Sequence, residues 1–282
     1  MIRKPVVAGS FYPADREELT NILNWAFKNS KKWPFKVEER GPRRITAVIS
    51  PHAGYTYSGP IAATSYAHLA EDGLPDVFVI IGPNHTGLGG RGSLASYEQW
   101  ETPLGLVSVD LDLCKELGRS VRGLSFENSA HTMEHSVEVQ IPFLQHIFGS
   151  DEFCIVPIVL LDHGPEITRE MGEVLGRISE EQSLDVVVIA SSDMTHYEPD
   201  SSARKKDGAV LEKITKMDIE GMYKTILQLD VSMCGPGPVA TAMWFSKKKN
   251  VSRGVLADYR TSGDMTGDRS AVVGYASVIF KC

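Results

Sequence analysis

The stretch that decides the fold is 45-ITAVISPHAGYTYSG-59, in which a continuous apolar run ends in a turn rich in proline and glycine. A second stretch, 76-DVFVIIGPNHTGLGG-90, repeats this arrangement, and a third apolar run, 184-LDVVVIASSDMTH-196, also ends in polar residues. Continuous apolar runs of this length predict central strands that are buried on both faces of a sheet. Ligands bind beyond the carboxyl ends of such strands in open α/β sheets. The side chains that we expect at this rim are His52, His85, Asp193 and His196.

Helical and extended patterns alternate along the rest of the chain. The predicted helices cover residues 15–29, 59–70, 110–119, 133–148, 165–180, 203–215, 218–229 and 236–248. The predicted strands cover residues 44–50, 76–82, 153–160, 184–191, 252–260 and 270–280. A Thr-Pro-Leu-Gly turn predicts a hairpin within 92–109, and the last two strands are expected to pair antiparallel through a turn at 263–268. The predicted fold class is therefore α/β: a single domain over residues 1–282, with a mixed, mostly parallel central β-sheet flanked by helices on both faces.

The composition is that of a soluble globular protein. The 282 residues are 42% hydrophobic and 23% charged, with a net charge of −7. Two short basic runs, Arg204–Lys206 and Lys247–Lys249, are interpreted as solvated helix surface, so no nucleic-acid partner is expected. No run approaches the roughly 20 apolar residues of a membrane span, and the N-terminus does not resemble a signal peptide. We expect a cytoplasmic protein without a membrane partner, with its four cysteines reduced.

The turns around His52 and His85 carry the first candidate site. Pro51 restricts the backbone before His52, and Gly54 permits close approach by a partner. The functional interpretation is a metal ligand or a base, and the alternative is a turn histidine satisfied by backbone groups. A phosphate-binding loop around His85 is disfavoured, because no Gly-Lys-Ser/Thr follows and the glycine spacing is wrong for a dinucleotide fingerprint.

Asp193 and His196 are separated by three positions in SSDMTH. If a helical turn begins here, both face one side, and Asp193 can accept the ring proton of His196. The other ring nitrogen is then free as an acid or base. The alternative is that Asp193 is a helix N-cap.

Cys234 stands directly before Gly-Pro-Gly-Pro and an apolar helical pattern. A helix N-terminus lowers the pKa of a thiol and favours the thiolate, the form that binds metals. The alternative is a buried, inert cysteine.

The segment 131-HTMEH-135 matches a metalloprotease pattern in which two histidines bind zinc and Glu134 is the base. This alternative is disfavoured because Thr132 is a good N-cap, which would leave His131 outside the helix. We expect His135 to point from the helix start into the crevice, as a group on the substrate side.

Five motifs in fixed order, PHAGYTYSG, GPNH, EHSVEVQ, SSDMTH and CGPGP, resemble those of the MEMO family. The resemblance runs from AGSFYP at 8–13 to GYASV near the C-terminus. That family is similar in structure to class III extradiol (LigB-type) dioxygenases. The resemblance implies a LigB-dioxygenase-like fold and a pocket that binds one metal ion, Fe(II) or copper, with zinc as a third candidate. The residues that it assigns to the metal are His52, His85 and Cys234.

The same resemblance extends to residues around the metal. It assigns Asp193 and His196 to the acidic residue and additional histidine of the pocket, and His135 to the histidine of the EHS motif. Phe11 and Tyr12 match an aromatic pocket entrance, and eukaryotic members are described as binding phosphorylated peptides. Extradiol dioxygenases use a carboxylate as the third ligand, whereas a thiolate shifts metal preference toward softer ions.

Two functions follow as expectations. The first is a metal-dependent redox enzyme of dioxygenase-like type, in which Asp193, His196 and His135 serve catalysis on a small substrate. The second is a non-catalytic protein that uses the pocket to hold a metal, a peptide or a small anion. The oligomeric state is left open.

Overall fold

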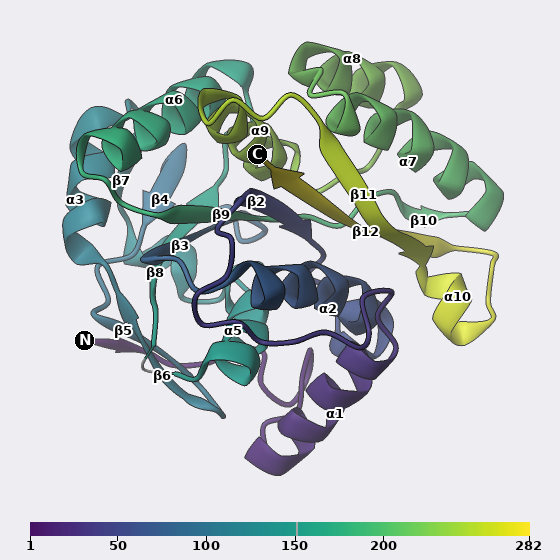
Figure 1. Ribbon diagram of the computed structural model, residues 1–282. Helices are drawn as coiled ribbons and strands as arrows, with labels where there is room; N and C mark the ends of the chain where they lie inside the picture. Colours follow the sequence, from purple (N-terminus) through teal and green to yellow (C-terminus); the bar gives the residue numbers. More distant parts are fainter. Residues whose placement is uncertain (151) are drawn as a thin grey trace.

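The computed structural model describes residues 1–150 and 152–282. A single mixed sheet dominates it (Figure 1), with the strand order β1-β5-β6-β8-β3-β9-β2-β12-β10. β11 pairs with β12, and β4 and β7 pair beside β8. The strands are β1 (Ile2–Arg3), β2 (Ile45–Ser50), β3 (Val77–Pro83), β4 (Gly92–Leu94), β5 (Gln99–Thr102), β6 (Gly105–Val109), β7 (Leu124–Phe126), β8 (Cys154–Leu160), β9 (Val186–Ser191), β10 (His196–Glu198), β11 (Gly254–Thr261) and β12 (Val272–Lys281).

The centre of the sheet is parallel and its margins are mixed. β8, β3, β9 and β2 run parallel, and every residue of β2, β3 and β9 is buried. β12 pairs antiparallel with both β2 and β11, and β5 pairs antiparallel with β6. The predicted α/β class, the mixed sheet, the hairpin and the antiparallel final pair are therefore confirmed.

Helices cover both faces of the sheet (Figure 1). α2 packs on β2 and β12 together with α1 and α5, and α9 packs on β9 and β2 and is covered by α6. The helices are α1 (Arg16–Lys28), α2 (Tyr55–Asp72), α3 (Leu111–Ser120), α4 (Asn128–His131), the 3-10 turn η1 (Glu138–Gln140), α5 (Ile141–Phe148), α6 (Pro165–Glu181), α7 (Asp200–Thr215), α8 (Ile219–Leu229), α9 (Pro236–Lys248) and α10 (Ser262–Thr266). No helix in the described part of the chain has the length and apolar character needed to cross a membrane.

Two predicted helical segments are wrong. Residues 133–148 do not form one helix, because α4 ends at His131 and α5 begins only at Ile141. The backbone between them is not held by regular helical hydrogen bonds. Instead, the N–H groups of His135 and Ser136 donate to the side-chain carboxylate of Glu134. The helical turn expected at Asp193 is also absent from the described structure, where the chain continues without helix into β10.

The N-terminal segment stabilises the non-helical backbone between α4 and α5. The buried guanidinium of Arg3 donates to the carbonyls of His131 and Glu134 and pairs with the carboxylate of Glu138. Both side chains of this ion pair are at most 2% exposed. Glu138 also accepts the hydroxyl of Tyr12 at 2.6 Å. The first residues of the chain thus fix the backbone that carries Glu134 and His135.

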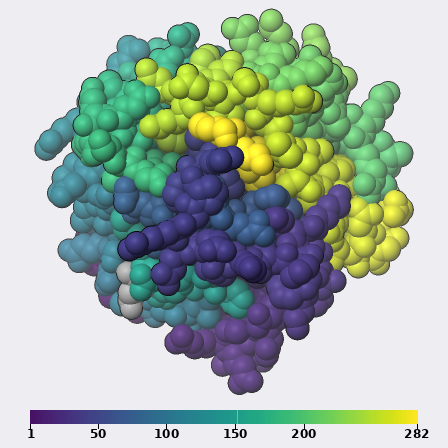
Figure 2. Space-filling model, in the orientation of Figure 1, coloured from purple at the N-terminus to yellow at the C-terminus, as the bar shows by residue number. Residues whose placement is uncertain are grey.

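The C-terminal strand lies beside the first of the central strands. β12 lies beside β2, and the N–H of Cys282 donates to the carbonyl of Arg44. In the space-filling view the yellow C-terminal atoms accordingly lie against dark-blue atoms of the N-terminal third (Figure 2).

Candidate metal centre

The three neighbouring strands β3, β9 and β2 end at one edge of the sheet. Val79 of β3 and Val48 of β2 lie on either side of β9, so the loops that follow the three strands leave the sheet together. His52 follows β2 and His85 follows β3. The structure thus brings these two histidines to the rim where we expected them.

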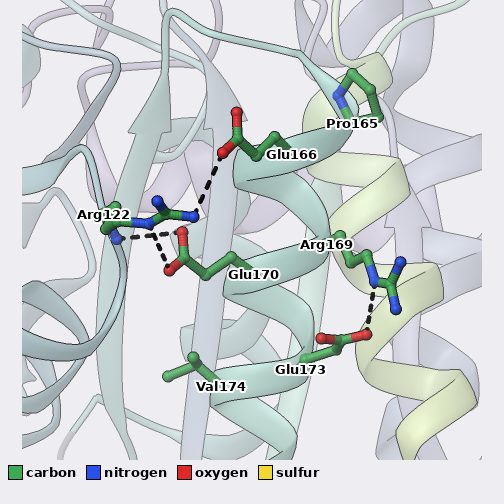
Figure 3. A pocket seen from close by; sticks show the side chains of 7 residues that line it. All are labelled: Arg122, Pro165, Glu166, Arg169, Glu170, Glu173 and Val174. Carbon is green, nitrogen blue, oxygen red and sulfur yellow. Dashed lines mark hydrogen bonds and ion pairs between the residues drawn. The ribbon is translucent and has the colours of Figure 1, made fainter.

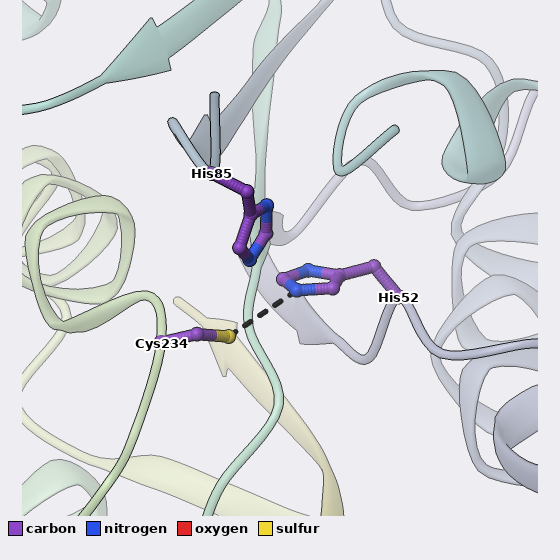
Figure 4. Close-up of side chains that lie close together, drawn as sticks. All are labelled: His52, His85 and Cys234. Atoms are coloured by element: carbon purple, nitrogen blue, oxygen red, sulfur yellow. Dashed lines mark hydrogen bonds between the residues drawn. The ribbon is translucent and has the colours of Figure 1, made fainter. Parts of the chain in front are cut away.

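Cys234 completes a cluster with His52 and His85 (Figure 4). One potential ligand atom from each residue lies within 4.8 Å of the others. The Sγ atom of Cys234 is 3.2 Å from Nε2 of His52. Two such atoms on one metal ion are about 3.1 Å apart at a right angle and about 3.5 Å apart at the tetrahedral angle, given metal–nitrogen and metal–sulfur bonds of about 2.05 and 2.3 Å. The spacing and the donor types both fit a single metal ion.

The ring of His52 is held in one tautomer by a chain of buried groups. Nδ1 lies 2.8 Å from Oγ of Ser191, whose hydroxyl donates to the carbonyl of Ser136 and accepts from Nε2 of Gln140. Because that single hydroxyl proton is already used, Nδ1 of His52 must donate. Nε2 therefore carries the lone pair and faces Cys234. Gln140 is fixed in turn by the carbonyl of Pro51, which accepts from its Nε2.

Glu134 orients the second ring. Its Oε1 lies 2.9 Å from Nδ1 of His85, and its Oε2 accepts the backbone N–H of the same residue. A carboxylate behind a histidine fixes the tautomer and leaves Nε2 for a metal ion. Although burial alone would raise the pKa of Glu134, the hydrogen bonds from His85 and from backbone N–H groups hold it at about 2.

A second group of potential ligands, formed by His85, Glu134 and His135, shares one residue with the first. Glu134 is 1% exposed, and its two oxygens already meet Nδ1 of His85 and the backbone N–H groups of His85, His135 and Ser136. A carboxylate with four donors has little capacity left for a cation. Glu134 therefore orients His85, and the group formed by His52, His85 and Cys234 is the candidate metal site.

The thiol of Cys234 lies beside Asp193. Burial, and next the negative charge of Asp193, raise the pKa of its thiol, although the backbone N–H of Asp193 donates to Sγ at 3.1 Å. The expectation that the start of α9 lowers this pKa is therefore wrong for the metal-free pocket. A bound cation would supply the missing positive charge and displace the proton.

Asp193 lies against the same cluster. Its side chain accepts the backbone N–H of His52 at 2.9 Å, and burial raises its pKa to about 6. Asp193 does not accept the ring proton of His196 in the described structure, contrary to expectation. Instead, Nδ1 of His196 donates to the carbonyl of Ser232 at 2.8 Å, and the N–H of His196 donates to Oγ of Ser232. The ring of His196 is thus oriented by Ser232 and not by Asp193, and in the described part of the chain its Nε2 makes no hydrogen bond.

His135 stands in an aromatic stack. Its ring centroid lies 4.6 Å from that of His85 and 4.6 Å from that of Phe11. Burial lowers the pKa of His135 to about 4, so the ring is neutral near pH 7. Phe11 thus reaches the cluster. Tyr12 does not fit the expected pocket entrance, because it is 2% exposed and its hydroxyl is held by Glu138.

The metalloprotease alternative fails on geometry. His131 ends α4, is completely buried, and directs Nε2 to the carbonyl of Ser93. It belongs to neither group of potential ligands in the described chain. The N-cap expected at Thr132 is wrong, because Thr132 follows the end of α4 and does not begin a helix.

A groove elsewhere on the surface carries no comparable chemistry. It has a volume of about 580 Å³ and lies along the first turns of α6 beside Arg122 (Figure 3). Arg122 pairs with Glu166 and Glu170, and Arg169 pairs with Glu173. Both arginines of the groove are thus engaged by its three glutamates, so the groove offers no free cation to an anionic ligand.

The fold and this site define an α/β protein with a histidine–cysteine pocket at the carboxyl edge of its parallel strands. The chain belongs to the Memo-like protein family, whose sequence pattern matches residues 3–279. It is 47% identical to a MEMO1 family protein of Ignicoccus hospitalis over 283 residues, covering 99% of each chain. A MEMO1 family protein of Methanopyrus kandleri is 45% identical, covering 100% of this chain and 99% of the relative.

A solved structure supports the fold alone. The uncharacterized protein JW3007 from Escherichia coli K12 superposes with a TM-score of 0.55 at 14% identity. The match covers 84% of this chain and 99% of the other.

Proposed function

We propose that the protein binds one metal ion through His52, His85 and Cys234 and is a metal-dependent redox enzyme of dioxygenase-like type. The observation that carries this proposal is that three potential ligand atoms lie within 4.8 Å of one another. In addition, Nδ1 of each imidazole is hydrogen-bonded, to Ser191 for His52 and to Glu134 for His85. Two imidazoles and a thiolate suit Fe(II) or copper, and also zinc. When bound, the metal would supply Lewis-acid and one-electron chemistry at positions that the three ligands leave open.

The surrounding residues suit roles toward a small substrate. Nδ1 of His196 donates to the carbonyl of Ser232, which leaves Nε2 available for proton exchange with a substrate. His135 is neutral near pH 7 and lies beside His85, which suits a substrate-side group. Phe11 packs on His135 and offers an apolar surface on this side of the cluster. Asp193 holds the backbone of His52 and is assigned to positioning.

Metal analysis of full-length protein purified without chelators tests the ligand set. We expect about one metal ion per chain in the wild type and a loss of stoichiometric metal in His52→Ala and Cys234→Ser. Cys282→Ser and His68→Ala are matched controls that should keep the metal, because Cys282 is at the chain end and His68 lies in α2 away from the cluster. Undiminished metal in both ligand variants would refute the assignment.

A non-catalytic role is the second candidate. It is favoured by Cys234, which stands where extradiol dioxygenases use a carboxylate. Under this reading the pocket holds a metal, or a peptide or small anion against Phe11 and the histidines. The distinguishing measurement is oxygen uptake after anaerobic loading with Fe(II), against a panel of catechols. Sustained uptake with a ring-opened product would exclude the binding-only role.

A further inference from the structure

A fourth histidine stands at the end of a fourth strand. His163 follows β8, the parallel neighbour of β3, in which Leu160 pairs with Pro83. The carbonyl of Leu160 accepts the N–H of Asn84 at 2.8 Å, so the loops that leave the two strands start together. His85 belongs to the second of these loops. Burial lowers the pKa of His163, although the charge of Asp162 acts in the opposite direction.

The ring of His163 is fixed in one tautomer by the start of α9. Its Nδ1 accepts the backbone N–H of Gly237 at 3.2 Å. Nδ1 therefore carries the lone pair and Nε2 carries the proton. A Cβ atom at position 237 would lie 2.7 Å from this nitrogen, so glycine permits the approach. The carbonyl of His163 accepts the hydroxyl of Tyr223 at 2.7 Å, which holds the backbone as well.

The proton on Nε2 is a donor that the protein does not use. No group in the described chain accepts a hydrogen bond from it. The nearest carboxylate in sequence, that of Asp162, accepts from Nε of Arg91 at 2.8 Å and from the N–H of Gly164 at 2.7 Å. Its charge is therefore balanced locally by Arg91.

The start of α9 presents its positive end chiefly through this ring. Pro236 and Pro238 have no N–H, and the N–H of Gly235 donates to Oγ of Ser192. The N–H of Gly237 is the one that His163 accepts. An imidazole placed at a helix N-terminus in this way stays neutral and is a stronger donor at its other nitrogen. Because a phosphate needs several donors, a single N–H suits a carboxylate better.

We propose that Nε2–H of His163 donates a hydrogen bond to a carboxylate oxygen of the small ligand that occupies the metal pocket. This inference rests on the proposed metal site and specifies its ligand as a carboxylate-bearing molecule. His163 lies in the loop after β8 and contacts the start of α9 at Gly237, three residues after Cys234. The geometry that carries the assignment is the register of β8 with β3, the contact with Gly237 and the unused proton.

The test is calorimetric titration of full-length, zinc-loaded protein with benzoate. We expect saturable binding to the wild type and a loss of affinity of about tenfold or more in His163→Phe, as a missing charge-assisted hydrogen bond predicts. His163→Gln, which offers an amide N–H, should recover part of that loss. His68→Phe is the matched control and should bind as the wild type does. Benzyl alcohol, a neutral probe of similar size, should not distinguish the wild type from His163→Phe. Equal benzoate affinity in these two proteins, or no saturable binding to the wild type, would overturn the proposal.

A spectroscopic readout separates the role of the ring from simple loss of structure. Long-range proton–nitrogen spectra of histidine-labelled protein should show the Nε2–H tautomer for His163, with its signals moving on addition of benzoate. Gly237→Ala should displace the ring and weaken benzoate binding. Zinc content, measured on the same samples, distinguishes the two proposals. If the protein takes up no zinc but still binds benzoate through His163, the proposed metal site is refuted and this inference stands. If it holds stoichiometric zinc but binds benzoate equally well without His163, this inference is refuted and the metal site stands.

Discussion

Nδ1 of His52 and Oγ of Ser191 lie 2.8 Å apart, and this contact decides which edge of the imidazole faces Cys234. The hydroxyl of Ser191 is committed to the carbonyl of Ser136 at 2.7 Å, so it can only accept from His52. The nitrogen of His52 that faces Cys234 is thus set by a residue at the end of β9.

Ser191→Ala should weaken metal binding by about 10- to 100-fold, the usual cost of removing a group that orients a metal ligand. Competition titration with a chromophoric chelator measures this. Ser246→Ala is the matched control, because Ser246 is equally buried and bonds to Oγ1 of Thr46 at 2.8 Å, near the end of β2 that is opposite His52. If both variants lost affinity alike, a general loss of stability would be the cause and the tautomer argument would fail.

Glu134→Gln should lower both stability and metal affinity. The substitution places an amide N–H₂ group among N–H donors, so at least one buried donor loses its acceptor, at a cost of about 1–3 kcal/mol. Urea unfolding of metal-free protein gives the first quantity, and chelator competition gives the second. Glu170→Gln, on the surface beside Arg122, should change neither. Wild-type metal affinity in Glu134→Gln would show that His85 needs no carboxylate behind it.

Acid should destabilise the metal-free protein from about pH 6.5 downward. Burial lowers the pKa of His131 to about 4 from an ordinary 6.5. In the unfolded chain His131 therefore binds a proton below about pH 6.5, whereas in the folded chain it binds one only below about pH 4. This contribution to stability is present above pH 6.5 and is lost as the pH falls, by up to about 1.4 kcal/mol per pH unit. His131→Gln, which can still reach the carbonyl of Ser93, should flatten the curve of unfolding free energy between pH 4 and 6.5. Parallel curves for the two proteins would contradict the prediction.

Metal binding should release the thiol proton of Cys234. Because burial raises the pKa of this thiol in the metal-free pocket, affinity should increase with pH across the neutral range, by up to about tenfold per unit. For the same reason iodoacetamide should label Cys234 slowly before metal is added, and Cys282, which is exposed, should react first. Cys114 and Cys154, with pKa values raised by burial to about 12 and about 11, should also be slow. Mass-spectrometric mapping checks the order, and rapid labelling of Cys234 in the metal-free state would restore the thiolate expected from the start of α9.

Removing the Arg3 guanidinium should cost more than any surface charge. Arg3→Ala leaves the carboxylate of Glu138 buried and unpaired, which destabilises a fold by about 3–5 kcal/mol. The matched control is Arg122→Ala, whose partners are exposed, and it should change stability by less than about 1 kcal/mol. Chemical unfolding of both variants provides the comparison, and equal effects would show that the buried pair contributes little to holding the N-terminal segment.

The central strands were predictable because their signal is strong and local. β2, β3 and β9 are continuous apolar runs, and each is buried throughout, so composition alone identifies them. The position of His52 and His85 at the strand ends follows from the same runs, since the chain has little freedom between the last strand residue and the turn. Cys234 lies far along the chain from both, and its approach to His52 could be inferred only from family resemblance.

The segment from His131 to Gln140 shows why other parts were not predictable. Its residues favour a helix locally, but the carboxylate of Glu134 is used by His85 and the adjacent carbonyl by Arg3, which lies more than a hundred positions away in sequence. Tertiary contacts therefore override the helical pattern. The partners Ser191, Gln140 and Ser232 carried no sequence signal, because serine and glutamine are common and their role appears only when the loops meet. Glu134 was visible as an acid beside His135, yet its true partner could not be read from spacing.

The position of β2 in the sheet has a consequence for how the protein is made. β2 is synthesised early but pairs on one side with β9 and on the other with β12, the last strand of the chain. Cys234 also emerges from the ribosome long after His52 and His85. A growing chain therefore has both imidazoles before their proposed sulfur partner, and β2 lacks its second neighbour until residues 272–281 have been made. The proposed cation site thus requires residues from both halves of the chain and cannot form on the N-terminal half alone.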